Sequence, residues 1–484
     1  MNNIWRNARH LNNLVQQIES TKQIQRPSDD PMRANRALRY RTILSENEQF
    51  VSNVDRGLAW MEVTESSFNN ILTGTPSNPS IMQRLYTRLV EAAQTGTNHI
   101  EDQRAMIEEM RQFLYQLTEV EMNQTYMGRY VFSGFHTDQP PVLRQDNRNA
   151  NYVVQQTFQL HDIETTIAFH RPNPTTRPVT FEGVHIMKLP FANNDITTLN
   201  FANTTPAGVP DLGISVNGFS GFTILERNST DPDAYIPEDF DAASNPVIHF
   251  IRDTGELVMS DEVRQQFFAS GEISVTYEVN GLREGDLNPR IYFPSWDMST
   301  NPPAAFHAAS ESIELEISAR SHITINSHAS NVITDKLVAD LRRLIDFADS
   351  LVSTDSAVLR EFYGATYTGD DLTSAIVRFE SDENTIFAGM MHDRINNMLE
   401  SVTRYMADAQ REQTNLGSRM MRTDMIRIRL EEDEISYTAL LSETIDTDIA
   451  GTIVRKDGAE AAFNNALFAI SRATQLSLAD FINR

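Results

Sequence analysis

The stretch QIQRPSDDPMRANRAL, residues 23–38, decides how the N-terminal part of the chain folds, because it separates two helix-like segments. Pro27 disfavours a helical conformation at the residue before it. Ser28 or Asp30 can then cap the next helix, and Pro31 fits its first turn. The sequence therefore predicts an interhelix joint made by Pro27, Ser28, Asp29, Asp30 and Pro31.

The two aspartates of this joint also allow a metal or general-acid pair. That interpretation has weaker support, because adjacent carboxylates at a helix start usually cap the helix or face the positive end of its dipole. We therefore expect Asp29 and Asp30 to be structural.

Outward from the joint, apolar residues recur at every third or fourth position, which is typical of helices packed lengthwise. This spacing occurs at both ends of the chain, from Ile4 to Ile18 and from Phe463 to Phe481. Each stripe is narrow and needs a partner, so we infer that the two terminal helices pair, either within one chain or between neighbouring copies. The predicted assembly interface consists of Ile4, Leu11, Val15, Ile18, Phe463, Leu467, Ile470, Leu478 and Phe481.

The middle of the chain has a different pattern. Apolar residues alternate from Ile273 to Val279, and the dipeptides Asn217-Gly218 and Asn280-Gly281 are typical of hairpin turns. We predict a mainly α fold, in which long coiled-coil or bundle helices from both termini flank an inserted antiparallel β domain. The predicted divisions are terminal helical segments at 1–26 and 452–484, a helical bundle at 27–127 and 334–451, and a β-rich outer domain at 128–333.

Composition excludes several classes of function. The 484 residues carry a formal net charge of −25, which opposes binding to nucleic acid or to anionic membranes. Cysteine is absent, so disulfides and thiolate sites are excluded. No apolar run approaches the ~20 residues of a membrane helix, and the first residues lack a signal-peptide core, so we expect neither membrane insertion nor a cleaved signal.

Catalytic and metal sites have little support in the sequence. Asp253-Thr254-Gly255 matches the aspartic-protease triplet, but Glu256 follows where that family has a small residue, and a hairpin turn explains the triplet. The 11 histidines form no HExxH motif. We therefore predict no enzymatic activity, no catalytic or metal-binding residue and no cofactor.

An acidic segment, residues 231–241, could bind calcium through its carboxylates. It lacks the glycine and the closing glutamate of a calcium loop. We therefore favour a solvated surface loop and expect its removal to be tolerated.

Several motifs carry a resemblance to a known family. The joint at residues 26–31, the segment Gln94-Thr95-Gly96-Thr97 and the sequence GRYVFSG at 128–134 resemble hook-filament junction proteins, the third hook-associated proteins of the bacterial flagellin superfamily. The closing segments LLS at 440–442 and SLADFI at 477–482 are similar to that family as well. The serine-glycine pair that often precedes the joint is absent, so the connection before it is expected to be stiffer than usual.

The resemblance implies an axially assembled structural adaptor that joins hook to filament, with paired terminal helices inside and the β insert outside. The implied partners are neighbouring copies, another hook-associated protein, filament flagellin and a cytoplasmic export chaperone. The implied location is the extracellular flagellum, reached through the flagellar type III apparatus. Flagellin itself remains an alternative, as does a β-domain adhesin or protease on a helical stalk.

Overall fold

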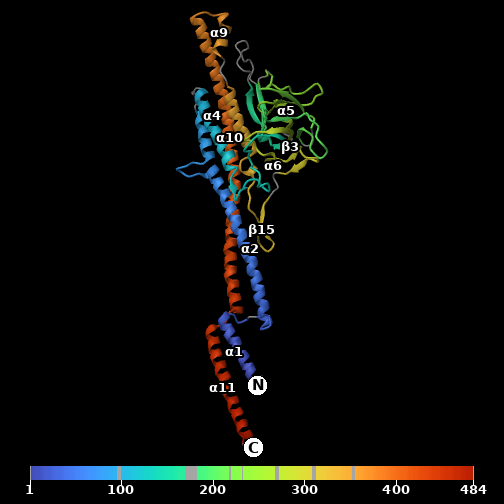
Figure 1. The fold of residues 1–484 in the computed structure, drawn as a ribbon. Coiled ribbons are helices and arrows are strands. Elements are labelled where there is room, and N and C mark those ends of the chain that lie inside the picture. The colour runs from blue at the N-terminus through green and yellow to red at the C-terminus, as the bar shows by residue number, and fades with distance from the viewer. Residues whose placement is uncertain are drawn as a thin grey trace. The chain divides into compact units, whose positions relative to one another are not determined.

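The computed structural model describes residues 2–24, 26–94, 100–168, 182–216, 220–229, 231, 233–267, 272–307, 312–351 and 355–482. The chain divides into two compact units. Unit 1 comprises residues 1–57, 315–323 and 421–484, and unit 2 comprises residues 58–314 and 324–420. The two ends of the sequence therefore fold into the same unit (Figure 1).

Unit 1 contains the helices formed by the two chain ends. These are α1 (Asn2–Ser20), the first part of α2 (Pro31–Phe68), the last part of α10 (Asp370–Ile445), and α11 (Ile449–Ile482). Between α2 and α10, the buried side-chain amide of Asn47 donates to the carbonyl oxygen of Leu430 at 2.8 Å. The rings of Tyr40 and Tyr437 also approach, with centroids 6.4 Å apart.

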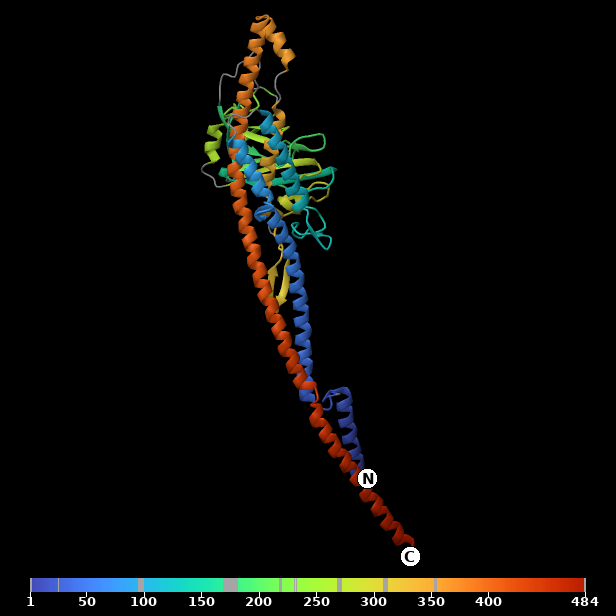
Figure 2. The ribbon, with the colours of Figure 1, turned by 90° about the vertical axis from the view of Figure 1, so that its left-hand side faces the viewer.

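A short hairpin completes this unit. Its strands are β14 (Glu314–Ser318) and β15 (Ser321–Thr324), and Figure 2 shows it alongside α2 and α10. Ile317 and Ile323 are buried, because alternate residues of a strand point to the same face. Asn53 of α2 donates to the carbonyl oxygen of Glu316 at 2.9 Å, which attaches the hairpin to the helix.

Unit 2 contains shorter helices beside its share of α2 and α10. They are the π-helical turns η1 (Asn69–Thr73) and η2 (Gln116–Glu121), α3 (Ile81–Gln94), α4 (Ile100–Tyr115), the 3-10 turn η3 (Leu160–Asp162), α5 (Asp261–Phe267), α6 (Pro289–Tyr292), α7 (Ala329–Val332), α8 (Asp335–Ser350) and α9 (Ser356–Gly364). Thr334 caps α8, since its hydroxyl accepts from the backbone of Leu337.

The β region of unit 2 has two larger sheets and a small hairpin. One sheet has the order β4 (Glu164–Ala168), β5 (Glu182–Lys188), β10 (Glu256–Met259), β9 (Val247–Ile251), β8 (Thr223–Arg227). The other has the order β13 (Ala304–Phe306), β12 (Ser295–Asp297), β3 (Asn147–Phe158), β11 (Ile273–Leu282), β6 (Thr198–Asn200), and β7 (Gly213–Val216) also pairs with β11. The hairpin pairs β1 (Thr125–Tyr126) with β2 (Arg129–Tyr130).

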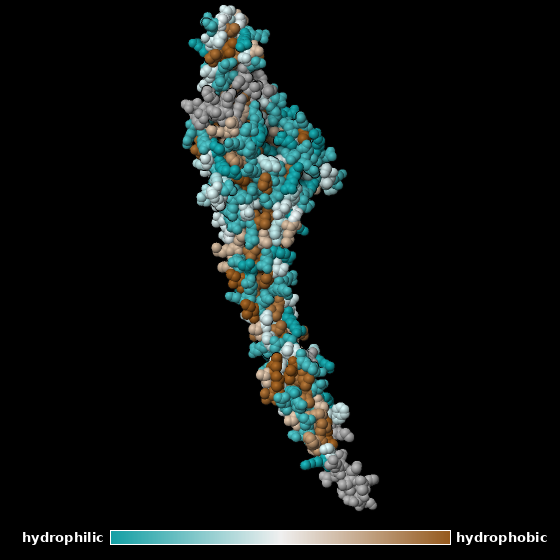
Figure 3. Space-filling model, turned by 60° about the vertical axis from the view of Figure 1, so that its left-hand side comes forward, coloured by the Kyte–Doolittle hydropathy of each residue, from teal (hydrophilic) through white to brown (hydrophobic). Residues whose placement is uncertain are grey.

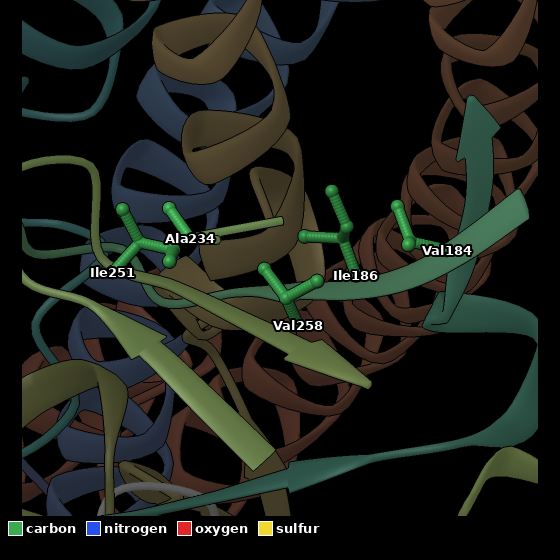
Figure 4. Close-up of a cluster of buried hydrophobic side chains, with 5 residues drawn as sticks. All are labelled: Val184, Ile186, Ala234, Ile251 and Val258. Atoms are coloured by element: carbon green, nitrogen blue, oxygen red, sulfur yellow. The ribbon is translucent and has the colours of Figure 1, made fainter. Parts of the chain in front are cut away.

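Aromatic side chains fill the space between the two larger sheets. The ring of Phe201 lies 4.9 Å from that of Phe250 in β9 and 6.0 Å from that of Tyr277 in β11. The opposite face of the first sheet carries a cluster of five buried residues (Figure 4), namely Val184, Ile186, Ala234, Ile251 and Val258. Lys188 and Glu256 share this face, because they lie two residues along from Ile186 and Val258.

The predicted fold class is confirmed, since terminal helices flank a β region that is antiparallel except for the parallel pair β8–β9. The turn at Asp253-Thr254-Gly255 is the predicted hairpin, with Ile251 opposite Glu256. The prediction of a turn at Asn280-Gly281 is wrong. Gly281 lies at a bulge inside β11, where its φ of 72° is one that glycine adopts readily. Asn217-Gly218 lies outside the described residues.

Candidate assembly surface

The helices α1 and α11 lie side by side within unit 1, as both ribbon views show (Figures 1 and 2). The inferred pairing of the chain ends therefore occurs within one chain. Leu14 is the most enclosed side chain described on α1, with 4% of its surface exposed. The pairing thus buries little apolar surface on that helix.

The joint between α1 and α2 is closed by its own aspartates. Oδ1 of Asp30 accepts from the backbone amides of Met32 and Arg33, at 3.1 and 3.0 Å. Asp30, and not Ser28, therefore caps α2, and Pro31 occupies the first helical position. Asp29 accepts from the backbone amide of Arg26 at 2.8 Å, so its carboxylate also fixes the backbone.

Contacts between the two chain ends hold the start of α11 beside the joint. The backbone amide of Gln23 donates to the carbonyl of Ile445 at 2.7 Å, and that of Thr447 donates to the carbonyl of Thr21 at 3.0 Å. Lys22 and Asp446 form an ion pair at 2.8 Å, and the hydrogen bond from Lys22 lowers the pKa of Asp446. Thr21 has a φ of 55°, which is costly for a β-branched residue.

The predicted interface residues differ in how far this pairing covers them. Five are half-buried, namely Ile4, Leu11, Val15, Ile18 and Phe463. Leu467 and Ile470 remain 44% and 40% exposed. The side chains of Leu478 and Phe481 lie outside the described residues, although α11 extends past both positions.

Sequence reasoning missed the most exposed apolar side chains of this surface. Val454 and Phe468 on α11 are 73% and 72% exposed, and Trp5 on α1 is 65% exposed. Val454, Ala461 and Phe468 are spaced by seven residues and share one helix face, which we call the outer stripe. This seven-residue spacing is the sequence signal that could have identified the outer stripe. Figure 3 shows apolar side chains gathered over the paired helices near the chain ends.

The other candidate sites are occupied by structural contacts. Asp253 accepts from the backbone amide of Ser229 at 2.9 Å, and no group of three potential metal ligands occurs among the described residues. In the acidic segment, Asp233, Glu238 and Asp239 are exposed, but Ala234 is fully buried and Tyr235 donates to Glu256 at 2.7 Å. The expectation of a merely solvated loop is therefore wrong, because its middle packs against the sheet.

Within the described part of the chain, no helix has the length and apolar character needed to span a bilayer.

Two long helices contributed by opposite ends of one chain lie side by side and leave large apolar side chains exposed, which is the arrangement that the resemblance to the flagellin superfamily implies. In agreement, residues 1–137 match the family model of the bacterial flagellin N-terminal helical region. The N-terminal part of this chain is thus flagellin-like. No curated protein sequence matches the chain.

Solved structures with a similar course include a provisionally named flagellar hook-associated protein from Vibrio parahaemolyticus, at 10% identity and a TM-score of 0.36, covering 86% of this chain and 100% of that one. FlgL from Xanthomonas campestris is 9% identical with a TM-score of 0.28, and the match covers 84% of this chain and 99% of that one. The flagellar junction protein FlgL from Legionella pneumophila is 11% identical with a TM-score of 0.27, and the match covers 86% of this chain and 100% of that one. At these scores no residue or role transfers by superposition.

Proposed function

We propose that this chain is a structural adaptor of the bacterial flagellum that joins the hook to the filament and has no catalytic activity. The exposure of Val454 and Phe468 on a helix that already has a partner in its own chain carries this proposal. Burying such a side chain contributes about 1.5–3 kcal/mol, and every subunit of a tube repeats the contact. The terminal helices therefore assemble with those of neighbouring copies.

The match of residues 1–137 to the flagellin N-terminal helical region supports a place for the chain in the flagellum. The chain assembles outside the cell, next to another hook-associated protein and to filament flagellin. Before export, a cytoplasmic chaperone covers the apolar residues of α11, with Phe463, Leu467 and Ile470 as its contacts.

Flagellin is the second candidate, because the matched family model describes flagellin itself. The junction role is preferred because residues 128–134, GRYVFSG, resemble junction proteins more closely.

Deletion of the gene separates these two roles. Without a junction adaptor, cells keep their hooks and release flagellin into the medium, because filaments have nothing to grow from. Without flagellin, cells keep their hooks and release no flagellin. Hooks with no flagellin in the medium would contradict the adaptor role, and full-length attached filaments would contradict both roles.

A further inference from the structure

A buried ionic cluster attaches the five-stranded sheet to α8 and α10 in unit 2. Arg343 of α8 lies between two carboxylates of the sheet: its Nη1 contacts Glu164 of β4, and its Nε donates to Glu256 of β10 at 2.8 Å. Lys188 of β5, opposite Glu256, is also buried, and Nη1 of Arg394 on α10 lies 3.9 Å from Oε1 of Glu256. In the same region, Lys336 of α8 pairs with Asp162 of η3.

Asp340, on the same helix, has a neutral partner. Its Oδ2 accepts from the hydroxyl of Tyr405 on α10 at 2.8 Å. Among the described residues, no cation forms an ion pair with Asp340. The two cations of α8 in this region pair elsewhere, Arg343 with Glu164 and Glu256 and Lys336 with Asp162. The carboxyl group of Asp340 therefore has no ion-pair partner among these residues, whereas the carboxyl groups of Glu164 and Asp162 lie close enough to act on it.

We propose that the Asp340 carboxyl group is a pH-sensitive latch, which holds the five-stranded sheet against α8 and α10 while it is protonated and weakens that attachment when it ionises. Ionisation places a negative charge near Glu164 and Asp162 without a dedicated counter-ion, so the sheet and α8 repel each other at this contact.

The titration of Asp340 agrees with this arrangement. Burial, and next the charge of Glu164, raise the pKa of Asp340 from 3.8 to about 8. Asp162 acts in the same direction, whereas the Tyr405 hydroxyl and Arg343 act against it. The other charged or titratable groups near this contact include Lys336, paired with Asp162, His161, whose Nε2 lies 3.5 Å from Oδ1 of Asp162, and Arg404, which lies over the Tyr405 ring.

The sign of the effect follows from linkage. Between a pKa near 3.8 in the unfolded chain and about 8 in the folded one, the folded state holds more protons. Stability from this group is therefore greatest at low pH and falls as pH rises, until it levels off above pH 8. Between these two pKa values, a group with this shift changes the equilibrium between the closed and the opened state by about tenfold per pH unit.

Amide hydrogen exchange of the full chain between pH 6 and pH 10 tests the proposal, with protection factors corrected for intrinsic exchange. The variant Asp340→Asn mimics the protonated acid, and Asp393→Asn, an exposed position on α10, is the matched control. In β4 and α8, the wild type and Asp393→Asn should lose protection by about tenfold per pH unit from pH 6 to pH 8 relative to Asp340→Asn. Parallel pH profiles for all three proteins would overturn the proposal.

A second variant keeps the test decisive if Asp340→Asn fails to fold. Tyr405→Phe removes a hydrogen bond that favours the ionised form, so the pH at which the loss of protection levels off should move to a higher value. A profile that does not move, or that moves to lower pH, would count against the latch.

Discussion

Nε of Arg343 on α8 donates a hydrogen bond to Oε1 of Glu256 on β10 at 2.8 Å, and both side chains are at most 5% exposed. This pair joins a helix to a strand that lies 87 residues away in sequence. The surrounding charges lower the pKa of Glu256 to about 2, although its burial alone would raise it, so the carboxylate stays ionised. The β region is thus attached to the helices partly by buried charge.

Removing one partner of this pair should be costly. Arg343→Met leaves Glu256 and Glu164 without the cation they share, at a cost of about 3–5 kcal/mol in the free energy of unfolding. Urea denaturation followed by circular dichroism measures the loss. The control is Arg411→Met, which removes a side chain that is 80% exposed and pairs with Asp408, and it should cost less than about 1 kcal/mol. Equal losses in the two variants would show that the buried pair contributes no more to the free energy of unfolding than the exposed pair does.

The isolated chain should be a monomer with weakly protected ends. On α1, Leu14 is the one buried side chain among those described, so little apolar burial holds this helix in place. Amide exchange should therefore be faster in α1 and α11 than in α8, whose core residues are buried. Strong protection of both termini in a monomeric sample would refute this expectation.

Assembly should depend on the outer stripe. Phe468→Asp places a charge where we propose that a neighbouring copy packs, at a cost of several kcal/mol per buried site. Cells should secrete this variant without incorporating it and should be non-motile, and Leu467→Asp should behave in the same way. The control Asn465→Asp adds a charge at an exposed polar position and should assemble. Normal filaments with Phe468→Asp would exclude this face from the interface.

The chaperone should require α11. A variant that ends after Gly451 lacks Phe463, Leu467 and Ile470 and should lose binding in a pull-down with the purified chaperone. Full binding by the truncated chain would place the contact elsewhere.

The acidic segment should tolerate loss of charge but not loss of its packed residues. Replacing Asp233, Glu238 and Asp239 with their amides should change the free energy of unfolding by less than about 0.5 kcal/mol, because all three are exposed. Tyr235→Phe removes a hydrogen bond to the buried Glu256 and should cost about 2 kcal/mol. Thermal unfolding compares the triple variant with Tyr235→Phe. A greater loss of stability in the triple variant would show that the charges of the segment matter more than its packed residues.

Local patterns allowed much of the fold to be predicted. Pro27 and Asp30 located the joint because capping and proline chemistry act over a few residues. The bulge at Gly281 was misjudged because an Asn-Gly dipeptide suits both a hairpin turn and a bulge, each of which uses a positive φ. Only the strand pairing on either side distinguishes them.

The buried cluster could not be predicted from local spacing. Glu164, Glu256, Arg343 and Arg394 come from four separate elements, and the fold alone brings them together. Leu14 was missed for a different reason. Leu14 lies beside the predicted stripe, and its burial depends on the packing of α11 against α1, which local spacing does not reveal.

The location of the chain in the flagellum tests the adaptor role most directly. An epitope inserted after Glu238, an exposed position of the acidic segment, can be labelled with gold-conjugated antibody on intact flagella and viewed by electron microscopy. The adaptor role predicts label confined to a short zone where the hook meets the filament. Label distributed along the whole filament would contradict it and would identify the chain as a filament subunit.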